Sequence, residues 1–573
     1  MIGLNMGLTA AILIFMNVDK RIPRCEDDRF KYGPHGGFTI NTTTKLNQPT
    51  PQIPQFVRRI RRWPKGFECT KCRSVALLTR QRQSILVRNF QSLTKVHCLS
   101  CADVSVKEYN NDAKAFLCML GLWRAGGIWV PANVRNALQN NIDYFNDVGV
   151  QWLLYHSEFQ ADAEKLRQAV PTLKHLFCLD RDTPEHPALE RLIEQGAGTT
   201  VPDWGDPFGN PEQIMALWPT GGTTGRSKAV MMNNSSWGTT TEIAARHWYC
   251  DDLPPVCLMV APITHAAGGI AVMLTNIGAT NVIMRGFDPL EVMQNIEKHR
   301  VTHLFLPPTA YYAMLAHPKI KDFDYSSLRY FMVSSAPVAA DKLKQGLEIF
   351  GPCLCQSFGQ AESPVILTWN DPATIAAAGA GIHPERLNSC GKETYPVRVA
   401  VMDDEGELLG PGERGEIVAR GSLVTPGYYE NPEATAEIRG FGWHHTGDIG
   451  YQDEYGYFYI VDRKKDMIIS GGFNVYSVEV EAAILAMPQI RECAVIGVPD
   501  DKWGEAVKAI IVLKDEEILD EETVLAHCKV KLGSVKTPKS VEFRPEIPKT
   551  PTGKTDKKAI RSPYWADLER SVN

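Results

Sequence analysis

Apolar and polar residues recur with helix and strand periods along most of the chain. Residues 113–123 carry apolar side chains at helical spacing, and a strand-like apolar run follows at 128–131. Farther along, 281–284 has the pattern of a buried strand, 289–298 that of a helix, and 302–306 that of a second strand. A strand, a crossover helix and a strand predict a right-handed parallel unit.

The strand–helix order continues through the middle of the chain and changes in its C-terminal part. Residues 328–333 and 339–350 repeat the strand–helix order, so the middle of the chain is α/β. After about residue 462, shorter elements mix: helices are predicted at 478–486 and 521–531, and strands at 492–498, 506–513 and 540–544. We therefore expect a large α/β N-terminal domain with parallel sheets and a smaller α+β C-terminal domain of ordinary domain size.

No comparable periodicity organises residues 1–104. Three prolines at 49–54 predict an extended linker, and arginines cluster at 58–62. An apolar run at 8–16 is short for a membrane span, which needs about 20 residues. No basic residue precedes this run, as a signal peptide would require. A buried or frayed chain end is the favoured interpretation, and a membrane-associating segment is the alternative.

The main addition from composition is the uneven distribution of charge between residues 1–104 and the rest of the chain. The 573-residue chain is 44% hydrophobic and 22% charged, which excludes disordered, collagen-like and coiled-coil classes for the whole chain. Its net charge of −5 combines +11 over residues 1–104 (17 basic, 6 acidic) with −16 over the rest, since −5 − 11 = −16. We predict an atypical basic segment at 1–104, a large domain at 105–461 and a small domain at 462–573. No nucleic-acid partner is expected, because aromatic residues are not interleaved with the basic ones.

Fourteen cysteines are too dilute for a disulfide scaffold, so a cytoplasmic protein with reduced thiols is expected. Two tight pairs differ from the rest: Cys69 with Cys72, and Cys98 with Cys101. The 25 residues between the pairs exceed the spacing of about 15–20 in common zinc ribbons. Zinc binding, unpaired thiols, and mis-assigned sequence fused to a truncated enzyme all stay open for this segment.

Residues 220–228, which follow a strand-like run at 214–218, have the chemistry of a phosphate-binding loop. Their glycines let backbone N–H groups approach an anion, their threonines add hydroxyl donors, and Lys228 adds a positive charge. The loop is not a Walker A motif, because Lys228 follows Ser227 and no Gly-Lys-Ser/Thr series is present. A flexible surface turn is the alternative.

The loop is the first of several segments that, in this order, resemble motifs of the adenylate-forming (AMP-binding) superfamily, which includes acyl-CoA synthetases. The others are 357–362, 412–417, 445–448, 462–472 and 548–554. The segment 357–362 is similar to the family motif Tyr-Gly-x-Thr-Glu, with Phe358 and Ala361 in place of Tyr and Thr. The resemblance covers about residues 105–562 and implies a hinge between the two domains.

The resemblance implies ATP-dependent activation of a carboxylic acid to an acyl-adenylate, followed by transfer of the acyl group to CoA. Cations and N–H donors must then neutralise charge as the carboxylate attacks the α-phosphate. The residues that the resemblance assigns to ATP or CoA are Thr220, Gly221, Gly222, Thr223, Thr224, Gly225, Lys228, Ala336, Pro337, Phe358, Gly359, Asp448, Arg463, Gly471 and Gly472. Among these, Asp448 would accept hydrogen bonds from the ribose hydroxyls, and Arg463 would assist there.

The remaining implied roles concern the metal and the chemistry. Glu362 would bind Mg²⁺, Lys554 would contact the carboxylate and α-phosphate, and Lys465 would be the hinge. His265 would line the acyl pocket, unless it is a packed core histidine. The small residues at 266–269 favour an apolar or aryl acid, so we expect a fatty or aryl acid as substrate and a role in fatty acid metabolism, with peripheral membrane association as an open alternative.

Two other functions stay open. One is an acyl-adenylate former that loads a carrier protein or another acceptor. The other is an inactive binding homologue that lacks the usual N-terminal elements of the family.

Overall fold

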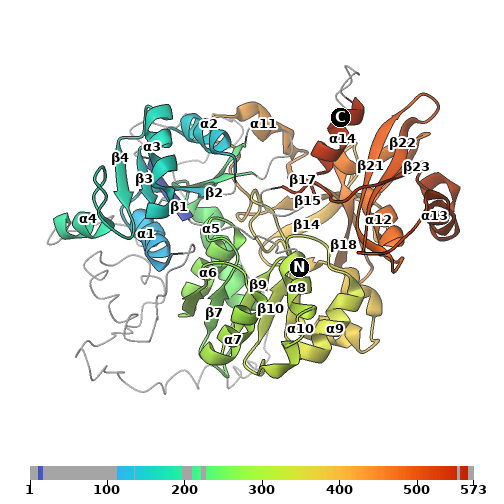
Figure 1. Cartoon of the computed structure of the whole chain (residues 1–573), viewed down its shortest axis with the longest axis horizontal. Helices are drawn as coiled ribbons and strands as arrows, with labels where there is room; N and C mark the ends of the chain where they lie inside the picture. Colours follow the sequence, from blue (N-terminus) through green and yellow to red (C-terminus); the bar gives the residue numbers. More distant parts are fainter. Residues whose placement is uncertain are drawn as a thin grey trace, which may run out of the picture.

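The computed structural model describes the backbone of residues 11–16, and residues 112–133, 136–196, 210–220, 227–550 and 555–565. Several predicted features lie outside these residues. They are the loop residues Gly221, Gly222, Thr223, Thr224 and Gly225, the predicted catalytic Lys554, the two cysteine pairs and the arginine cluster. Among the described residues, the strands form three sheets (Figure 1). No helix among the described residues has the length and apolar character needed to cross a bilayer.

The first sheet has the strand order β4-β3-β1-β2-β5-β6. Its strands are β1 (Ala11–Met16), β2 (Ile128–Asn133), β3 (Trp152–Tyr155), β4 (His175–Cys178), β5 (Ile214–Pro219) and β6 (Ala229–Asn233). The helices α1 (Ala113–Arg124), α2 (Leu138–Val148), α3 (Gln160–Ala169) and α4 (Leu189–Gln195) belong to the same part of the chain. Strand β1 pairs antiparallel with both β2 and β3. The apolar run near the N-terminus therefore contributes a strand inside a sheet, an element that the sequence did not predict for residues 1–104.

The second sheet joins a parallel half to an antiparallel half. The parallel half is β8 (Thr280–Ile283), β7 (Val256–Met259), β9 (His303–Leu306), β10 (Tyr330–Val333) and β11 (Leu354–Phe358), in that spatial order. The antiparallel half continues through β12 (Thr368–Asn370), β13 (Gly391–Glu393), β18 (Tyr457–Arg463), β17 (Trp443–Gln452), β15 (Gly415–Arg420) and β14 (Arg398–Met402). The short β16 (Arg439–Gly440) pairs with β17.

Strands β7, β9, β10 and β11 of the parallel half are buried on both faces, because their alternate residues enter different cores. In β7, Cys257 and Met259 pack into one core, while Leu258 packs into the other. The first core also holds side chains of α5 (Asn234–His247) and α6 (Ala266–Thr275). The second holds side chains of α7 (Pro289–His299), α8 (Pro308–Leu315), α9 (Ala340–Phe350) and α10 (Pro372–Gly379). Burial of both faces is what makes the strand sequences nearly continuous in apolar residues.

The third sheet belongs to the C-terminal unit. Its strands are β20 (Phe473–Val475), β19 (Ile468–Ser470), β22 (Gly504–Leu513) and β21 (Ile490–Asp500), with β23 (Ser540–Phe543) on the other side of β22. The accompanying helices are α12 (Ser477–Leu485), α13 (Glu521–Lys536) and α14 (Lys557–Trp565), and α11 (Pro432–Glu437) belongs to the preceding domain. The unit occupies the orange and red side of Figure 1.

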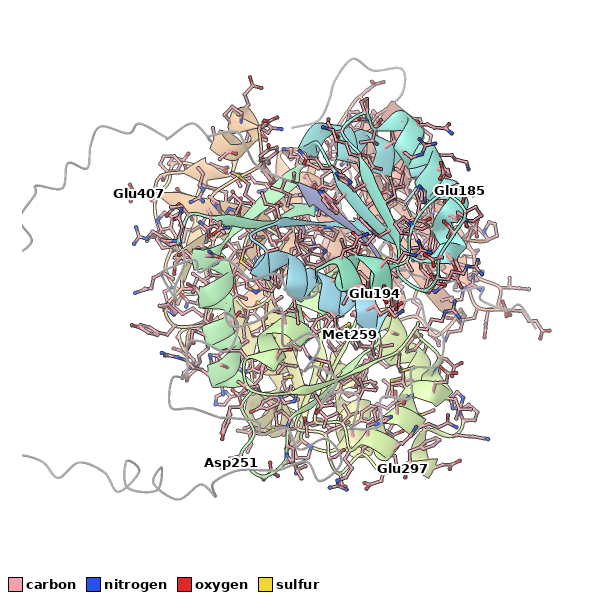
Figure 2. The ribbon with its side chains drawn as sticks, turned by 90° about the vertical axis from the view of Figure 1, so that its left-hand side faces the viewer. Glu185, Glu194, Asp251, Met259, Glu297 and Glu407 are labelled. Carbon is pink, nitrogen blue, oxygen red and sulfur yellow. The ribbon has the colours of Figure 1, made fainter. Side chains whose placement is uncertain are left out.

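The layers of the N-terminal part are clearest from the side. Figure 2 shows the layer that carries Glu185 and Glu194 above the layer that carries Met259 and Glu297. The expected α/β domain with parallel strands and the smaller β-rich C-terminal unit are thus both confirmed. The strand–helix–strand unit predicted at 281–306 is parallel as expected, but β7 lies between its two strands. As a consequence β8 lies at the end of the parallel strands, and its residues are only partly buried.

Candidate active site

The predicted phosphate loop connects the antiparallel strands β5 and β6, and described residues hold its two ends together. Thr220 N–H donates to the carbonyl of Lys228 at 2.9 Å, and Lys228 N–H donates to Thr220 Oγ1 at 3.1 Å. The last pair of the two strands, Pro219 and Ala229, lies next to this clasp. These two hydrogen bonds close the tip of the β5–β6 pair at the residues where the loop begins and ends.

Beside this tip lies the carboxylate that the sequence assigned to a metal. Tyr428 Oη donates to Glu362 Oε1 at 2.7 Å, and the ammonium of Lys228 lies 5.1 Å from the centre of the same tyrosine ring. Lys228 also reaches Glu437 at 3.4 Å. Burial, together with the negative charge of Glu362, raises the pKa of Tyr428, so its hydroxyl stays a donor at neutral pH. The tyrosine thus brings Lys228 and Glu362 to one place.

The turn after β11 requires a glycine. A Cβ at Gly359 would lie 2.6 Å from the backbone nitrogen of Val365, a distance that no real side chain adopts. The turn closes through a hydrogen bond of 2.9 Å from Gln360 N–H to the carbonyl of Ser363. Phe358 ends β11 and is buried in the first core. The close approach at Gly359 lets the next residues, Gln360 and Glu362, face two different parts of the site.

Asp448 and Arg463 meet at the other side of this turn. They are opposite each other in β17 and β18, and Arg463 Nε contacts Asp448 Oδ1 at 2.5 Å. Asp448 is buried, with 2% of its surface exposed. The amide of Gln360 donates to Asp448 Oδ2 at 2.8 Å and to the carbonyl of Thr446 at 2.6 Å. The turn 359–362 therefore links the predicted ribose-binding pair to the predicted metal ligand.

The predicted adenine-contacting residues follow β10 on an exposed loop. Ala336 and Pro337 are exposed, and Ser335 before them has a φ of +79°, which is uncommon for a residue other than glycine. Ser334 Oγ donates to the carbonyl of Ser357 at 2.5 Å and so ties this loop to β11. Left-handed residues of this kind often occur at functional sites, where the surrounding structure holds them in place.

His265 immediately precedes α6 and is half-buried. Its Nδ1 lies 2.9 Å from Thr264 Oγ1, and the carbonyl of Thr264 accepts a hydrogen bond of 3.1 Å from the indole of Trp218. Since Trp218 belongs to β5, this contact sets His265 near the strand that leads to the phosphate loop. A Cβ at Gly269 would lie 3.2 Å from the indole of Trp237, so this glycine of α6 faces an aromatic ring.

The remaining predicted residues lie at the predicted hinge or beyond it. Lys465 lies in the short helical segment Lys464–Asp466 after β18, and its carbonyl accepts a hydrogen bond of 3.2 Å from Arg561 of α14. Gly471 and Gly472 form the turn between β19 and β20, with φ values of +60° and +81° that glycine adopts without strain. Lys549 and Thr555 bridge antiparallel, so the ends of the segment that contains Lys554 lie side by side.

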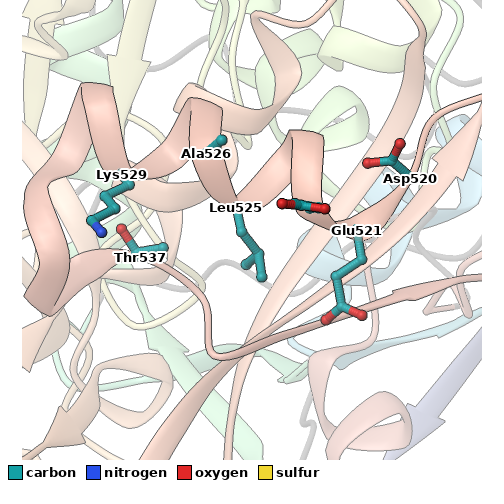
Figure 3. A pocket seen from close by; sticks show the side chains of 7 residues that line it. Asp520, Glu521, Leu525, Ala526, Lys529 and Thr537 are labelled. Carbon is teal, nitrogen blue, oxygen red and sulfur yellow. The ribbon is translucent and has the colours of Figure 1, made fainter.

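A pocket in the C-terminal unit holds none of the predicted residues. It is lined by Glu521, Leu525 and Lys529 of α13 and by Thr537, and it lies at the far edge of the unit (Figures 1 and 3).

Gln360 and Tyr428 are the site residues that sequence reasoning missed. Gln360 stands at the variable position of the motif 357–362, and Tyr428 belongs to a segment that matched no quoted motif. Their partners are 88 and 66 residues away in the sequence. The polar character of Gln360 between two small residues was the one signal that could have pointed to it.

The comparisons with known proteins agree with this geometry. Residues 109–429 match the family model described as AMP-binding enzyme, and residues 479–554 match the AMP-binding enzyme C-terminal domain. The chain belongs to the AMP-binding enzyme family. Its relatives over most of its length are acyl-CoA ligases, so the adenylate-forming acyl-CoA ligase family expected from the motifs is confirmed.

Individual relatives cover most of the chain and differ in their acids. The medium/long-chain-fatty-acid–CoA ligase FadD8 of Mycobacterium tuberculosis is 38% identical over 469 residues, which are 80% of this chain and 80% of that protein. A feruloyl-CoA synthase of Amycolatopsis sp is also 38% identical, over 69% of this chain and 82% of the relative. Among solved structures, ATP-bound MatB from Rhodopseudomonas palustris superposes with a TM-score of 0.70 at 26% identity. The match covers 85% of this chain and 93% of MatB.

Proposed function

We propose that this AMP-binding enzyme activates a carboxylic acid with ATP to an acyl-adenylate and then transfers the acyl group to the thiol of CoA. The observation that carries the proposal is the turn 359–362. It places Glu362 beside Lys228 and the phosphate-loop hairpin, and Gln360 beside Asp448 and Arg463. A nucleotide needs both kinds of group, cations and donors for its phosphates and a carboxylate for its ribose hydroxyls.

In the adenylation step, the substrate carboxylate would attack the α-phosphate and diphosphate would leave. The loop residues from Thr220 to Lys228 would hold the β- and γ-phosphates. Lys554 would neutralise charge between the two reacting anions, since a lysine provides a compact charge on a flexible stem. The ATP-bound structure of the MatB relative supports the nucleotide assignment.

The residues present fit a magnesium ion at the phosphate end. Glu362 offers hard carboxylate oxygens, and Tyr428 holds one of them by a hydrogen bond of 2.7 Å. Mg²⁺ is bound in such sites through one or two carboxylates together with substrate phosphates. When bound, the ion would neutralise part of the phosphate charge. Glu362 would hold it, and Lys228 would share the remaining charge.

The second half-reaction would use the other side of the hinge. We propose that the C-terminal unit rotates about Lys465, which removes Lys554 and brings in the turn at Gly471 and Gly472. The glycines allow close backbone approach to the pantetheine arm. The thiol sulfur would then attack the acyl carbonyl, a carbon–sulfur bond would form, and AMP would leave with the electron pair of the broken C–O bond.

For the acid, we propose a fatty or aryl acid. The buried residues of α6 are apolar, and a Cβ at Gly269 would lie 3.2 Å from the indole of Trp237 and 3.7 Å from that of Trp218. Such a wall suits an apolar acyl chain or an aromatic ring better than a charged amino acid. The 38% identity to both a fatty-acid and a feruloyl ligase agrees with this class. The free cysteines among the described residues fit a cytoplasmic enzyme.

The decisive test is ATP–diphosphate exchange with a panel of fatty and aryl acids, followed by thioester assay with CoA. We expect acid-dependent exchange and acyl-CoA formation for at least one acid of the panel. Exchange without a thioester would instead favour a carrier protein or another acceptor. An absence of exchange with every acid would favour a non-catalytic binding protein and contradict the proposal.

The division of labour between the half-reactions has its own test. Lys554→Ala should abolish adenylate formation but spare thioester formation from supplied acyl-adenylate, and exposed Lys558→Ala is the matched control. Equal loss of both half-reactions in the Lys554 variant would contradict the proposed role.

A further inference from the structure

The side-chain amide of Gln360 makes contacts in three directions. Its nitrogen donates to the carbonyl of Thr446 at 2.6 Å and to Asp448 Oδ2 at 2.8 Å, and its oxygen lies 3.4 Å from His444 Nε2. The two acceptors determine which end of the amide is nitrogen, because a carbonyl and a carboxylate cannot donate. The amide oxygen therefore faces Nε2 of His444, and both hydrogens of the amide nitrogen are used by the carbonyl and the carboxylate.

These contacts constrain Asp448 from two sides. Arg463 Nε contacts Oδ1 at 2.5 Å and the amide of Gln360 donates to Oδ2 at 2.8 Å, so the carboxylate cannot rotate without losing one of these two contacts. The two donors come from different elements, β18 and the turn after β11. A buried carboxylate held in this way is oriented before a ligand arrives, and such pre-organisation favours binding.

We infer that Gln360 is a positioning residue that orients the carboxylate of Asp448 for the ribose hydroxyls of the nucleotide. The inference rests on the proposed function, because it takes Asp448 as the ribose-binding residue. Gln360 itself need not touch the nucleotide. It acts through Asp448, and it couples the turn that carries Glu362 at the phosphate end to the strand that carries Asp448 at the ribose end.

The first experiment measures ATP binding by calorimetry in the full chain and needs no acid or CoA. Gln360→Met keeps the size of the side chain and removes both amide functions. We expect its Kd for ATP to rise about tenfold, the factor for losing one hydrogen bond to a charged group. In an Asp448→Asn background the same change should have little further effect, because residues that act as one unit are not additive.

The second experiment uses the pH dependence of an isosteric variant, Gln360→Glu. Two adjacent carboxylates cannot both ionise easily, so the pair keeps a proton to a higher pH than a lone carboxyl does. At low pH the protonated Glu would keep the hydrogen bond to Asp448 but not the one to the carbonyl of Thr446, because a carboxyl group has a single hydrogen. At high pH the two charges would repel. We therefore expect the ratio of variant to wild-type Kd to be about tenfold or more higher at pH 8 than at pH 5.5.

Other charged or titratable groups near this pair come from each neighbouring element. They are His444 and His445 on β17, Arg463 on β18, Lys465 after β18, Glu416 on β15, Arg439 on β16, Cys390 before β13 and Glu362 on the same turn. Burial lowers the pKa of His444 to about 4, so this histidine stays neutral over the range tested. These groups are present in both proteins, and their titration therefore largely cancels when the ratio to wild type is taken at each pH. Gln345→Glu on α9, away from the site, is the matched control and should give a ratio of one at every pH.

The outcomes separate the inference from the proposed function. Wild-type affinity in Gln360→Met, additive effects with Asp448→Asn, or a pH-independent ratio for Gln360→Glu would each overturn the positioning role alone. If the wild-type protein fails to bind ATP, the proposed nucleotide site is wrong and the inference falls with it. A melting temperature close to wild type in Gln360→Glu shows that altered binding does not arise from unfolding.

Discussion

Two carboxylate–cation pairs, one in the large domain and one in the C-terminal unit, differ in what surrounds them. In the large domain, Asp448 is buried while Arg463 is open to solvent, with side-chain exposures of 3% and 47%. In the C-terminal unit, Lys557 and Glu481 are both largely buried, at 15% and 16%, and their charged atoms are 2.8 Å apart. The first pair is therefore accessible from one side, and the second is closed.

The closed pair is satisfied by the protein alone. Lys557 also donates to Ser477 Oγ at 2.6 Å, and Glu481 accepts a hydrogen bond of 2.8 Å from the backbone of Val495. Burial raises the pKa of Glu481. Burial also opposes the charge of Lys557, but Glu481 and Asp462 outweigh it and raise the pKa of Lys557. We therefore expect the Asp448–Arg463 pair, with one exposed partner, to serve a ligand, and the closed Lys557–Glu481 pair to serve the fold.

Breaking the closed pair should give the largest effect. We expect Lys557→Met to lower the stability of the C-terminal unit by about 3 kcal/mol, because it leaves Glu481 buried without its counter-ion. Thermal unfolding of the full chain by calorimetry measures the loss. The double variant Lys557→Met/Glu481→Met should recover most of it, and exposed Lys558→Met should have little effect. A double variant as unstable as the single one would show that the ion pair is not the cause.

Breaking the open pair should affect activity more than stability. We expect Asp448→Asn to lower kcat/KM for ATP on the order of 100-fold, since it removes a charged acceptor that water does not replace in the bound state. Its melting temperature should stay close to that of the wild type, because Arg463 remains solvated. Diphosphate exchange at varied ATP concentration measures the first quantity, with exposed Asp251→Asn as control. Parallel loss of stability would remove the contrast between the two pairs.

The buried His444, near the Asp448–Arg463 pair, adds a test by pH to the comparison of the two ion pairs. Burial lowers the pKa of His444 from an ordinary 6.5 to about 4, so below pH 6.5 the unfolded chain binds a proton more readily than the folded one. Stability is therefore complete above pH 6.5 and falls as the pH decreases. We expect His444 to lower the free energy of unfolding by about 2 kcal/mol between pH 6.5 and pH 5.0.

His444→Gln should make the decline of the melting temperature with falling pH less steep. His303 of β9, whose pKa burial also lowers to about 4, should maintain the remaining slope. Exposed His383→Gln is the control. A slope unchanged by His444→Gln would contradict a neutral, buried His444.

The smallest expected effect concerns the turn on the C-terminal side of the hinge. A Cβ at Gly471 would lie 2.6 Å from the indole of Trp503, whereas one at Gly472 would meet nothing within 4 Å. Both residues have positive φ, so Gly471→Ala and Gly472→Ala share the backbone strain, and only the first adds a steric clash. We expect thioester formation from supplied acyl-adenylate to be about fivefold slower in Gly471→Ala than in Gly472→Ala, a difference near 1 kcal/mol. Equal rates would show that the contact with Trp503 does not matter for this step.

The local elements were largely predictable from periodicity. The helices predicted at 289–298 and 478–486 match α7 and α12 to within one residue at each end, because each has an apolar stripe of its own. The order of strands within the sheets was harder to predict from the sequence. β7 lies between β8 and β9, and β1 lies between β2 and β3, although about 110 residues separate β1 from its neighbour β2 in the sequence.

The residues of the candidate site also fall into two groups, those that the sequence predicted and those that it did not. Asp448, Arg463, Glu362 and Lys228 could be proposed from motifs, because each stands in a short segment with a recognisable order. Gln360 and Tyr428 could not, because their importance lies in a partner from another element. Nothing in the sequence of the turn 359–362 indicates that the side-chain amide of Gln360 reaches β17.

The sequence by itself determined the elements, the two-part organisation and the family, since periodicity and motif order are carried by neighbouring residues. The tertiary structure decided which side chains come into contact and how much of each contact is exposed to solvent. Asp448 and Glu481 are both buried carboxylates paired with cations, and only packing leaves Arg463 exposed while it covers Lys557. The physical reason is that desolvation depends on everything that surrounds a group in space, and most of those surroundings lie far away in the chain.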